Sequence, residues 1–211
     1  MTIVVDTIDT TPVTSFVREV MPFLPGVPEF EVEYRLKQTL RDFCRRSLVW
    51  RQPDTRLLTT VAGQKLYPSS LPLGTELAAV LSAWDGETEL TVIDADDEGS
   101  PGDTCQWPDV ALFGDDAIRL SPAPSIGGRI YTGSIALSPN EASTEIPAFI
   151  YRRWREAIKH GCTSRAMMEV GKPWSNPNQA MYHEREYDAM VTEASNSAGP
   201  VRRQGLRVKS W

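Results

Sequence analysis

The stretch that most constrains the fold of this chain runs from residue 147 to residue 198 and predicts two helices joined by a tight corner. Pro147 suits the first turn of a helix, where its missing N–H has no partner to lose. Small and apolar residues then recur at helical spacing as far as Gly171, which suits a left-handed helix end. Pro173 blocks any continuation, so the first helix ends at this glycine.

The second helix of this pair starts at Asn176, which suits the N-cap, followed by Pro177 as the first helical residue. Trp174 lies in the corner, where an aromatic ring is expected to plug the space between the two helices. Small residues on the first helix would let another helix approach closely; they are Ala157, Gly161, Cys162 and Ala166. The sequence therefore predicts a helical hairpin.

An earlier segment, residues 29–49, predicts another helix. Glutamates crowd its first turns and arginines its last, which is the distribution that the helix dipole favours. We expect residues 15–50 and 147–199 to form one helical bundle. Its predicted core consists of Leu36, Leu40, Phe43, Ile150, Trp154, Ile158 and Trp174.

Residues 51–140 have a different pattern, with short alternating runs and many turn signals. Asp85-Gly86 is a strong signal for a two-residue hairpin, and Gly114-Asp115-Asp116 indicates a further turn. This region predicts an antiparallel β module inserted between the helical segments. The expected fold class is therefore α+β, a helical bundle with an inserted β module.

Both ends of the chain are expected to lie outside these domains. Residues 1–14 predict an N-terminal arm that is either mobile or laid on a neighbour as an edge strand. Residues 200–211 mix cationic and apolar side chains, which is typical of a segment that docks on a partner. The predicted docking residues are Arg202, Arg203, Leu206, Arg207, Val208, Lys209 and Trp211.

Charge is unevenly distributed along the chain, whose net charge is −6. Residues 85–116 hold eleven carboxylates and no Lys or Arg, which argues against nucleic-acid binding by this part. Residues 147–211 hold eleven Lys/Arg and six Asp/Glu, a balance of 11 − 6 = +5. No signal peptide and no run long enough to span a membrane is recognised, and the three cysteines are widely separated.

The sequence offers little that suits catalysis or a cofactor. Its two histidines, His160 and His183, are expected on helix surfaces, and no metal-binding or nucleophile–base spacing is found. The acidic loop at 94–103 begins like a calcium loop but has Cys105 where the bidentate glutamate should stand. One alternative stays open, a carbohydrate-binding or glycan-degrading β module that stacks sugars on Trp84 and Trp107.

Four segments, in this order, carry a resemblance to a known family. They are Arg41–Arg46 with Trp50, Thr60–Tyr67, Ile118–Pro124, and Trp154–Ile158 continuing to Gly171–Ser175. Their order and spacing resemble the head-to-tail adaptor proteins of tailed bacteriophages, the tail tubular A or gatekeeper type. The resemblance covers roughly residues 15–198.

This resemblance implies a structural virion protein without enzymatic activity or cofactor. Such adaptors form a ring, commonly of twelve copies, below the portal protein and above the tail or tail nozzle. Double-stranded DNA passes through the channel without specific binding. The resemblance thus implies a location in the virion neck, and in the host cytoplasm during assembly. The family fold is a helical bundle that carries a β domain.

Overall fold

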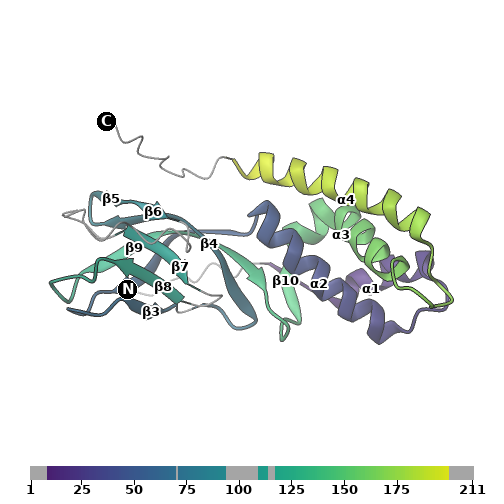
Figure 1. The fold of residues 1–211 in the computed structure, drawn as a ribbon, viewed down its shortest axis with the longest axis horizontal. Helices are drawn as coiled ribbons and strands as arrows, with labels where there is room; N and C mark the ends of the chain where they lie inside the picture. The colour runs from purple at the N-terminus through teal and green to yellow at the C-terminus, as the bar shows by residue number, and fades with distance from the viewer. Residues whose placement is uncertain (1–8, 70, 94–108, 114–116, 200–211) are drawn as a thin grey trace. The chain divides into compact units, whose positions relative to one another are not determined.

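The computed structural model describes residues 9–69, 71–93, 109–113 and 117–199. The chain divides into two compact units (Figure 1). The helical unit contains the chain up to Val49, Leu73–Thr75 and Ser138–Ala198. The β unit contains Trp50–Pro72 and Glu76–Leu137. The architecture is mixed α+β, with N-terminal helices, β sheets in the middle of the chain and a packed C-terminal helix pair.

The helical unit is built from four α-helices and a short 3₁₀ turn among the described residues. They are α1 (Thr14–Val20), η1 (Met21–Phe23), α2 (Glu29–Ser47), α3 (Ala148–Met167) and α4 (Pro177–Ala198). Glu29 and Glu31 lie in the first turn of α2, and its C-cap Leu48 takes a left-handed backbone with φ of 52°. Asn176 caps α4, because its side-chain oxygen accepts a hydrogen bond from the Gln179 N–H at 3.2 Å.

The predicted end of α3 was wrong by several residues. The helix stops at Met167, and Gly171 instead lies in the connecting turn. Its φ of +80° is a left-handed conformation that glycine adopts without strain. The N–H of Asn176 donates to the carbonyl of Met167 at 2.9 Å, and this bond closes the turn. A single left-handed glycine marks a corner but does not say how many turn residues precede it.

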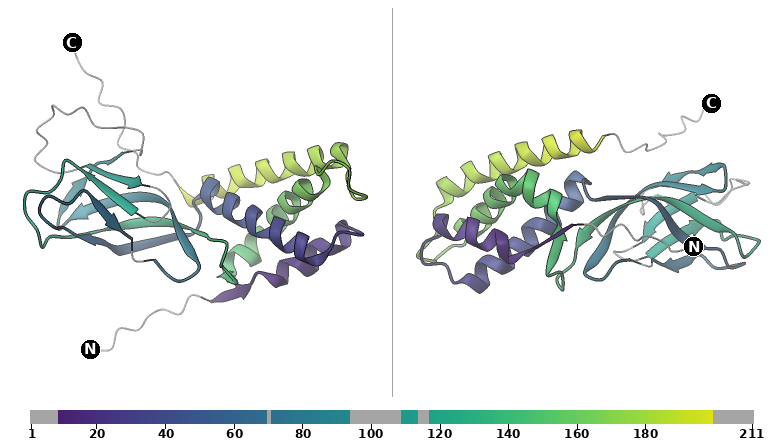
Figure 2. Two further views of the ribbon diagram at one scale, coloured as in Figure 1. Left: turned by 60° about the horizontal axis from the view of Figure 1, so that its bottom comes forward. Right: turned by 180° about the vertical axis from the view of Figure 1, so that it is seen from behind.

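Helix α3 is the centre of the helical unit, and α1, α2 and α4 pack against it. Figures 1 and 2 show α4 running alongside α3 after the turn. Six of the residues proposed for the core are buried here; they are Leu36, Leu40, Phe43, Ile150, Trp154 and Ile158. The rings of Phe43 and Trp154 lie 5.9 Å apart between α2 and α3.

Trp174, the seventh proposed core residue, is only half-buried. It lies in the turn between α3 and α4, whose neighbours Lys172 and Pro173 are exposed. The Lys172 ammonium lies 5.5 Å from the centre of its ring. The ring therefore lies at the end of the hairpin and not in the core of the bundle.

A small sheet joins the chain start to the helical unit. Strand β1 (Thr10–Pro12) pairs antiparallel with β10 (Glu145–Pro147), and Val13, which follows, is buried. The Thr10 hydroxyl also donates to the Glu145 carboxylate at 2.7 Å. Residues 10–13 thus pair within their own chain and differ from the free or neighbour-bound arm expected from the sequence.

The β unit holds two four-stranded sheets. One has the order β2 (Arg51–Thr59), β9 (Ile130–Pro139), β4 (Thr75–Asp85), β5 (Thr88–Leu90). The other has the order β3 (Leu66–Pro68), β8 (Ala117–Ser121), β7 (Asp109–Phe113), β6 (Val92–Ile93). The β6–β7 pair is parallel, unlike the antiparallel pairs of β2–β9, β3–β8, β4–β5 and β7–β8.

Both predicted hairpins are present in the described residues. Asp85 pairs with Thr88, so the two-residue turn that closes β4 onto β5 is Gly86-Glu87, one position later than the predicted Asp85-Gly86. Phe113 pairs with Ala117, which places β7 beside β8. Gly133 allows β9 to approach β4, because a Cβ there would collide with the carbonyl oxygen of Ser82.

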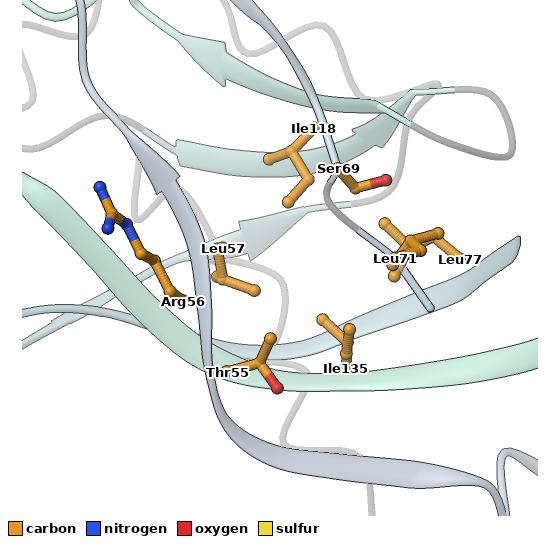
Figure 3. Close-up of a pocket in the computed structure, with 8 residues that line it drawn as sticks. All are labelled: Thr55, Arg56, Leu57, Ser69, Leu71, Leu77, Ile118 and Ile135. Carbon is orange, nitrogen blue, oxygen red and sulfur yellow. The ribbon is translucent and has the colours of Figure 1, made fainter. Parts of the chain in front are cut away.

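The two sheets share an apolar core. Figure 3 shows Leu57, Leu77 and Ile135 of one sheet and Ile118 of the other pointing toward one another. The cavity left between them measures about 10 Å³, which is room for a single water molecule. This gap is a packing defect of the β sandwich and is too small for a ligand.

Candidate functional site in the helical unit

A polar cluster fastens α2, α3 and α4 to one another. The Tyr187 hydroxyl of α4 donates a 2.8 Å hydrogen bond to the Asp42 carboxylate of α2. Arg165 of α3 pairs with the same carboxylate at 3.0 Å and donates to the Thr39 hydroxyl, also at 3.0 Å. We call Thr39, Asp42, Arg165 and Tyr187 the polar junction. Asp42 therefore receives one partner from each of the other two helices.

Tyr187 is the buried member of the polar junction, with a side chain that is only 3 % exposed to solvent. Burial, followed by the neighbouring Asp42 carboxylate, raises the pKa of the Tyr187 hydroxyl well above its ordinary value. The phenol is thus a neutral donor at any physiological pH. The guanidinium of Arg165 lies 5.5 Å from the centre of the same ring, which adds a cation–π contact.

Gly161 of α3 lies close to side chains of both α2 and α4. A Cβ at this position would lie 2.7 Å from the Thr39 methyl group and 2.7 Å from the Tyr187 ring. Contacts below 3.0 Å are not tolerated, so only glycine fits without a shift. The sequence predicted that Gly161, as a small residue, lets another helix approach closely. In the structure the approaching side chains are Thr39 of α2 and Tyr187 of α4.

Arginines extend this network toward the surface of α2. Arg46 pairs with Asp188 of α4 at 2.7 Å, and both side chains are exposed. Arg35 pairs with Glu31 at 2.9 Å and contacts Glu169, which follows α3. The exposed pair of Arg46 and Asp188 adds little stability, whereas the Arg35 pairs are part-buried.

The two histidines face each other across α3 and α4. The Nδ1 atoms of His160 and His183 are 2.8 Å apart, and both side chains are half-buried. Tyr182 lies against both rings, with ring centres 6.2 Å from His160 and 5.3 Å from His183. The sequence suggested two unrelated surface residues, because a spacing of 23 positions on two helices does not reveal a pair.

The outer face of α2 carries exposed aromatic side chains beside a groove. Phe30 is 72 % exposed and Tyr34 is 53 % exposed. The groove has a volume of about 440 Å³ and is closed on its other side by the segment after β9. Its lining consists of Phe30, Glu33, Tyr34, Lys37, Gln38, Arg41, Pro139, Asn140 and Glu141. Lys37 crosses it, pairing with Glu33 at 3.2 Å and reaching the Glu141 carbonyl at 3.5 Å.

Several residues singled out in the sequence lie outside the described residues. They are the docking segment 201–211 with Arg202, Arg203, Leu206, Arg207, Val208, Lys209 and Trp211, the acidic loop 94–103, and Trp107. Trp84, proposed for sugar stacking, is half-buried on β4 and pairs with Glu89 of β5.

Little in the described residues suits metal or thiol chemistry. No group of three or more His, Cys, Asp or Glu side chains there could hold a metal ion. Cys44 and Cys162 are free and buried, and burial raises the pKa of the Cys162 thiol to about 12, so it stays protonated. Within the same residues, no helix is both long and apolar enough to cross a membrane.

The sequence matches no protein-family model and no curated protein. The segments that carry the resemblance can nevertheless be located in the fold. In the β unit, Thr60–Tyr67 and Ile118–Pro124 lie side by side: Tyr67 of β3 pairs with Ile118 of β8. The Leu120 N–H donates to the Lys65 carbonyl at 2.8 Å, and the Gly63 N–H donates to the Pro124 carbonyl at 2.9 Å.

In the helical unit, the other two segments also meet. Phe43, in the segment at the end of α2, packs on Trp154 of α3. Four segments scattered along the sequence thus form two spatial pairs, one in each unit.

Proposed function

We propose that this protein is a head-to-tail adaptor of a tailed bacteriophage, a ring-forming virion protein that joins the portal of the head to the tail. The observation that carries the proposal is the pairing of the four resembling segments inside the two units. A chance resemblance of short segments would not require them to be neighbours in the fold. The mechanism is assembly, and the genome passes through the channel of the ring.

The surface of the helical unit is better suited to binding another protein than to binding a small substrate. Phe30 and Tyr34 present large aromatic area to solvent on one face of α2. Aromatic side chains are enriched at protein interfaces, and a closed ring needs one surface to bind a different surface of the next copy. Twelve copies would repeat this contact around the channel.

The charge distribution suits passage of DNA without binding. Residues 85–116 carry only acidic charge, and of the described members Glu87 is exposed. Like charge keeps a duplex from adhering to the protein, since non-specific binding depends on cations that neutralise phosphates. The cationic side chains of residues 201–211 are instead proposed to dock on the portal, with Trp211 as the main apolar anchor.

Assembly on isolated heads tests the proposal. DNA-filled heads that carry a portal but lack a neck are incubated with the purified protein, and sedimentation followed by electron microscopy shows whether a ring is added below the portal. Bovine serum albumin at the same concentration controls for adhesion. Absence of any added density on heads that accept their own neck proteins would refute the adaptor function.

A truncated chain tests the docking segment separately. Removal of residues 201–211 should abolish attachment while leaving the helical content of the protein unchanged. A matched variant keeps those eleven residues in scrambled order, so that charge is retained and the place of Trp211 is lost. Attachment by the truncated chain at the level of the full chain would show that the portal is bound elsewhere.

A further inference from the structure

We propose that His160 and His183 form a proton-sensitive clasp between α3 and α4, closed while the rings share one proton and opened when both rings carry a charge. The clasp joins the two arms of the hairpin one helical turn from the polar junction, since His183 precedes Tyr187 by four positions on α4. It does not depend on the adaptor function, since it follows from the two imidazoles alone.

The distance between the two rings shows that they are hydrogen-bonded. At 2.8 Å the two Nδ1 atoms are within hydrogen-bond distance, and one must donate while the other accepts. A neutral imidazole has one N–H, so one ring carries its proton on Nδ1 and the other on Nε2. Only one proton then lies between the rings.

The surroundings favour this neutral pair. Burial lowers the pKa of both imidazoles, and the Lys159 ammonium lowers them further. Glu156 of α3 and Glu186 of α4 act in the opposite sense, but neither hydrogen-bonds to a ring in the described residues, and Glu156 is paired with Lys159. Tyr182 of α4 contacts both rings with its aromatic face or edge. Lys159 in turn lies over the Phe23 ring of η1, which adds no charge.

One proton added to the donor ring at Nε2 leaves the bond in place, because that ring still donates from Nδ1 and the other ring still accepts. A second added proton, on the acceptor Nδ1, removes the bond. Both Nδ1 atoms would then be donors that face each other, and the two positive rings would repel at close range. The folded pair binds fewer protons than the unfolded chain when the pH falls below the ordinary histidine pKa of 6.5, because both pKa values are lowered in the fold. The stability that the clasp contributes is therefore complete above about pH 6.5 and is lost as the pH falls through the lowered values.

The chain is well suited to a test, because these are its only two histidines. Thermal unfolding of the full chain is followed by circular dichroism at pH 7.5 and pH 5.5, with a chelator present to exclude metal binding. The double variant His160→Leu/His183→Leu replaces the pair by apolar contact that does not titrate. We expect the wild type to lose several degrees more than the double variant on acidification. An equal loss in both proteins would overturn the proposal.

Imidazole ¹⁵N NMR of the wild type gives a second readout that needs no variant to fold. At pH 7.5 we expect one protonated and one unprotonated Nδ1, coupled through the hydrogen bond, and loss of the coupling as the pH is lowered. The single variants His160→Gln and His183→Gln should each remove the coupling and leave a single ring that titrates in one step. Two uncoupled rings, both protonated at Nε2 at pH 7.5, would overturn the proposal.

Discussion

Replacement of Gly161 by alanine tests how the three helices are packed. The new methyl group would lie 2.7 Å from the Thr39 methyl group and 2.7 Å from the Tyr187 ring. Ordinary van der Waals contact begins near 3.4 Å, so α2 and α4 must each move by several tenths of an ångström. Both neighbours belong to the polar junction, and the movement weakens the hydrogen bond between Tyr187 and Asp42.

The expected cost follows from three terms. Overpacking of a close contact costs about 1–3 kcal/mol. A weakened hydrogen bond to a charged group costs about 1.5–3 kcal/mol if it is lost completely. Alanine in a helix interior gains about 1 kcal/mol over glycine. We therefore expect a net loss of about 2–3 kcal/mol, which lowers the melting temperature of a chain of this size by roughly 5–10 °C.

Thermal and urea unfolding, followed by circular dichroism at 222 nm, report on the helical unit. The matched control is Ser195→Ala on the exposed face of α4, which improves helix propensity without a new contact and should not destabilise. Adding Thr39→Ser to Gly161→Ala removes one colliding methyl group, keeps the hydroxyl and should recover part of the loss. An alanine variant as stable as the wild type would refute the packing described for Gly161.

Further predictions concern other parts of the chain. Trp154→Ala should lower the free energy of unfolding by about 3–5 kcal/mol, because the side chain is buried against Phe43, whereas half-buried Trp174→Ala should lower it by only about 1–2 kcal/mol in the same melts. Gly133→Ala should destabilise the β unit, as measured by Trp fluorescence during unfolding, because its Cβ collides with backbone of β4; an unchanged midpoint would contradict the close approach of β9 to β4. The isolated protein should sediment as a monomer at micromolar concentration, since a portal ring is expected to template assembly; a closed ring without portal would contradict this.

Local signals in the sequence determined which segments are helices and where most of them begin. Asn176-Pro177 starts α4, glutamates begin α2, and the signal at Asp85-Gly86 locates the β4–β5 turn to within one residue, because capping and turn chemistry act over a few residues. Helical spacing also identified the buried face of α2 and much of that of α3. The α+β class followed from the order of these segments.

The fold alone decided which distant residues are neighbours. No pattern in the sequence predicts that Asp42, Arg165 and Tyr187 form one cluster, because they lie on three different helices. For the same reason, none predicts that His160 faces His183. The pairing of β1 with β10 likewise joins segments 135 residues apart, and local propensity cannot predict such a contact. Periodicity fixes the face that a helix buries, but the rotation and height at which two such faces meet depend on the packing of every side chain between them.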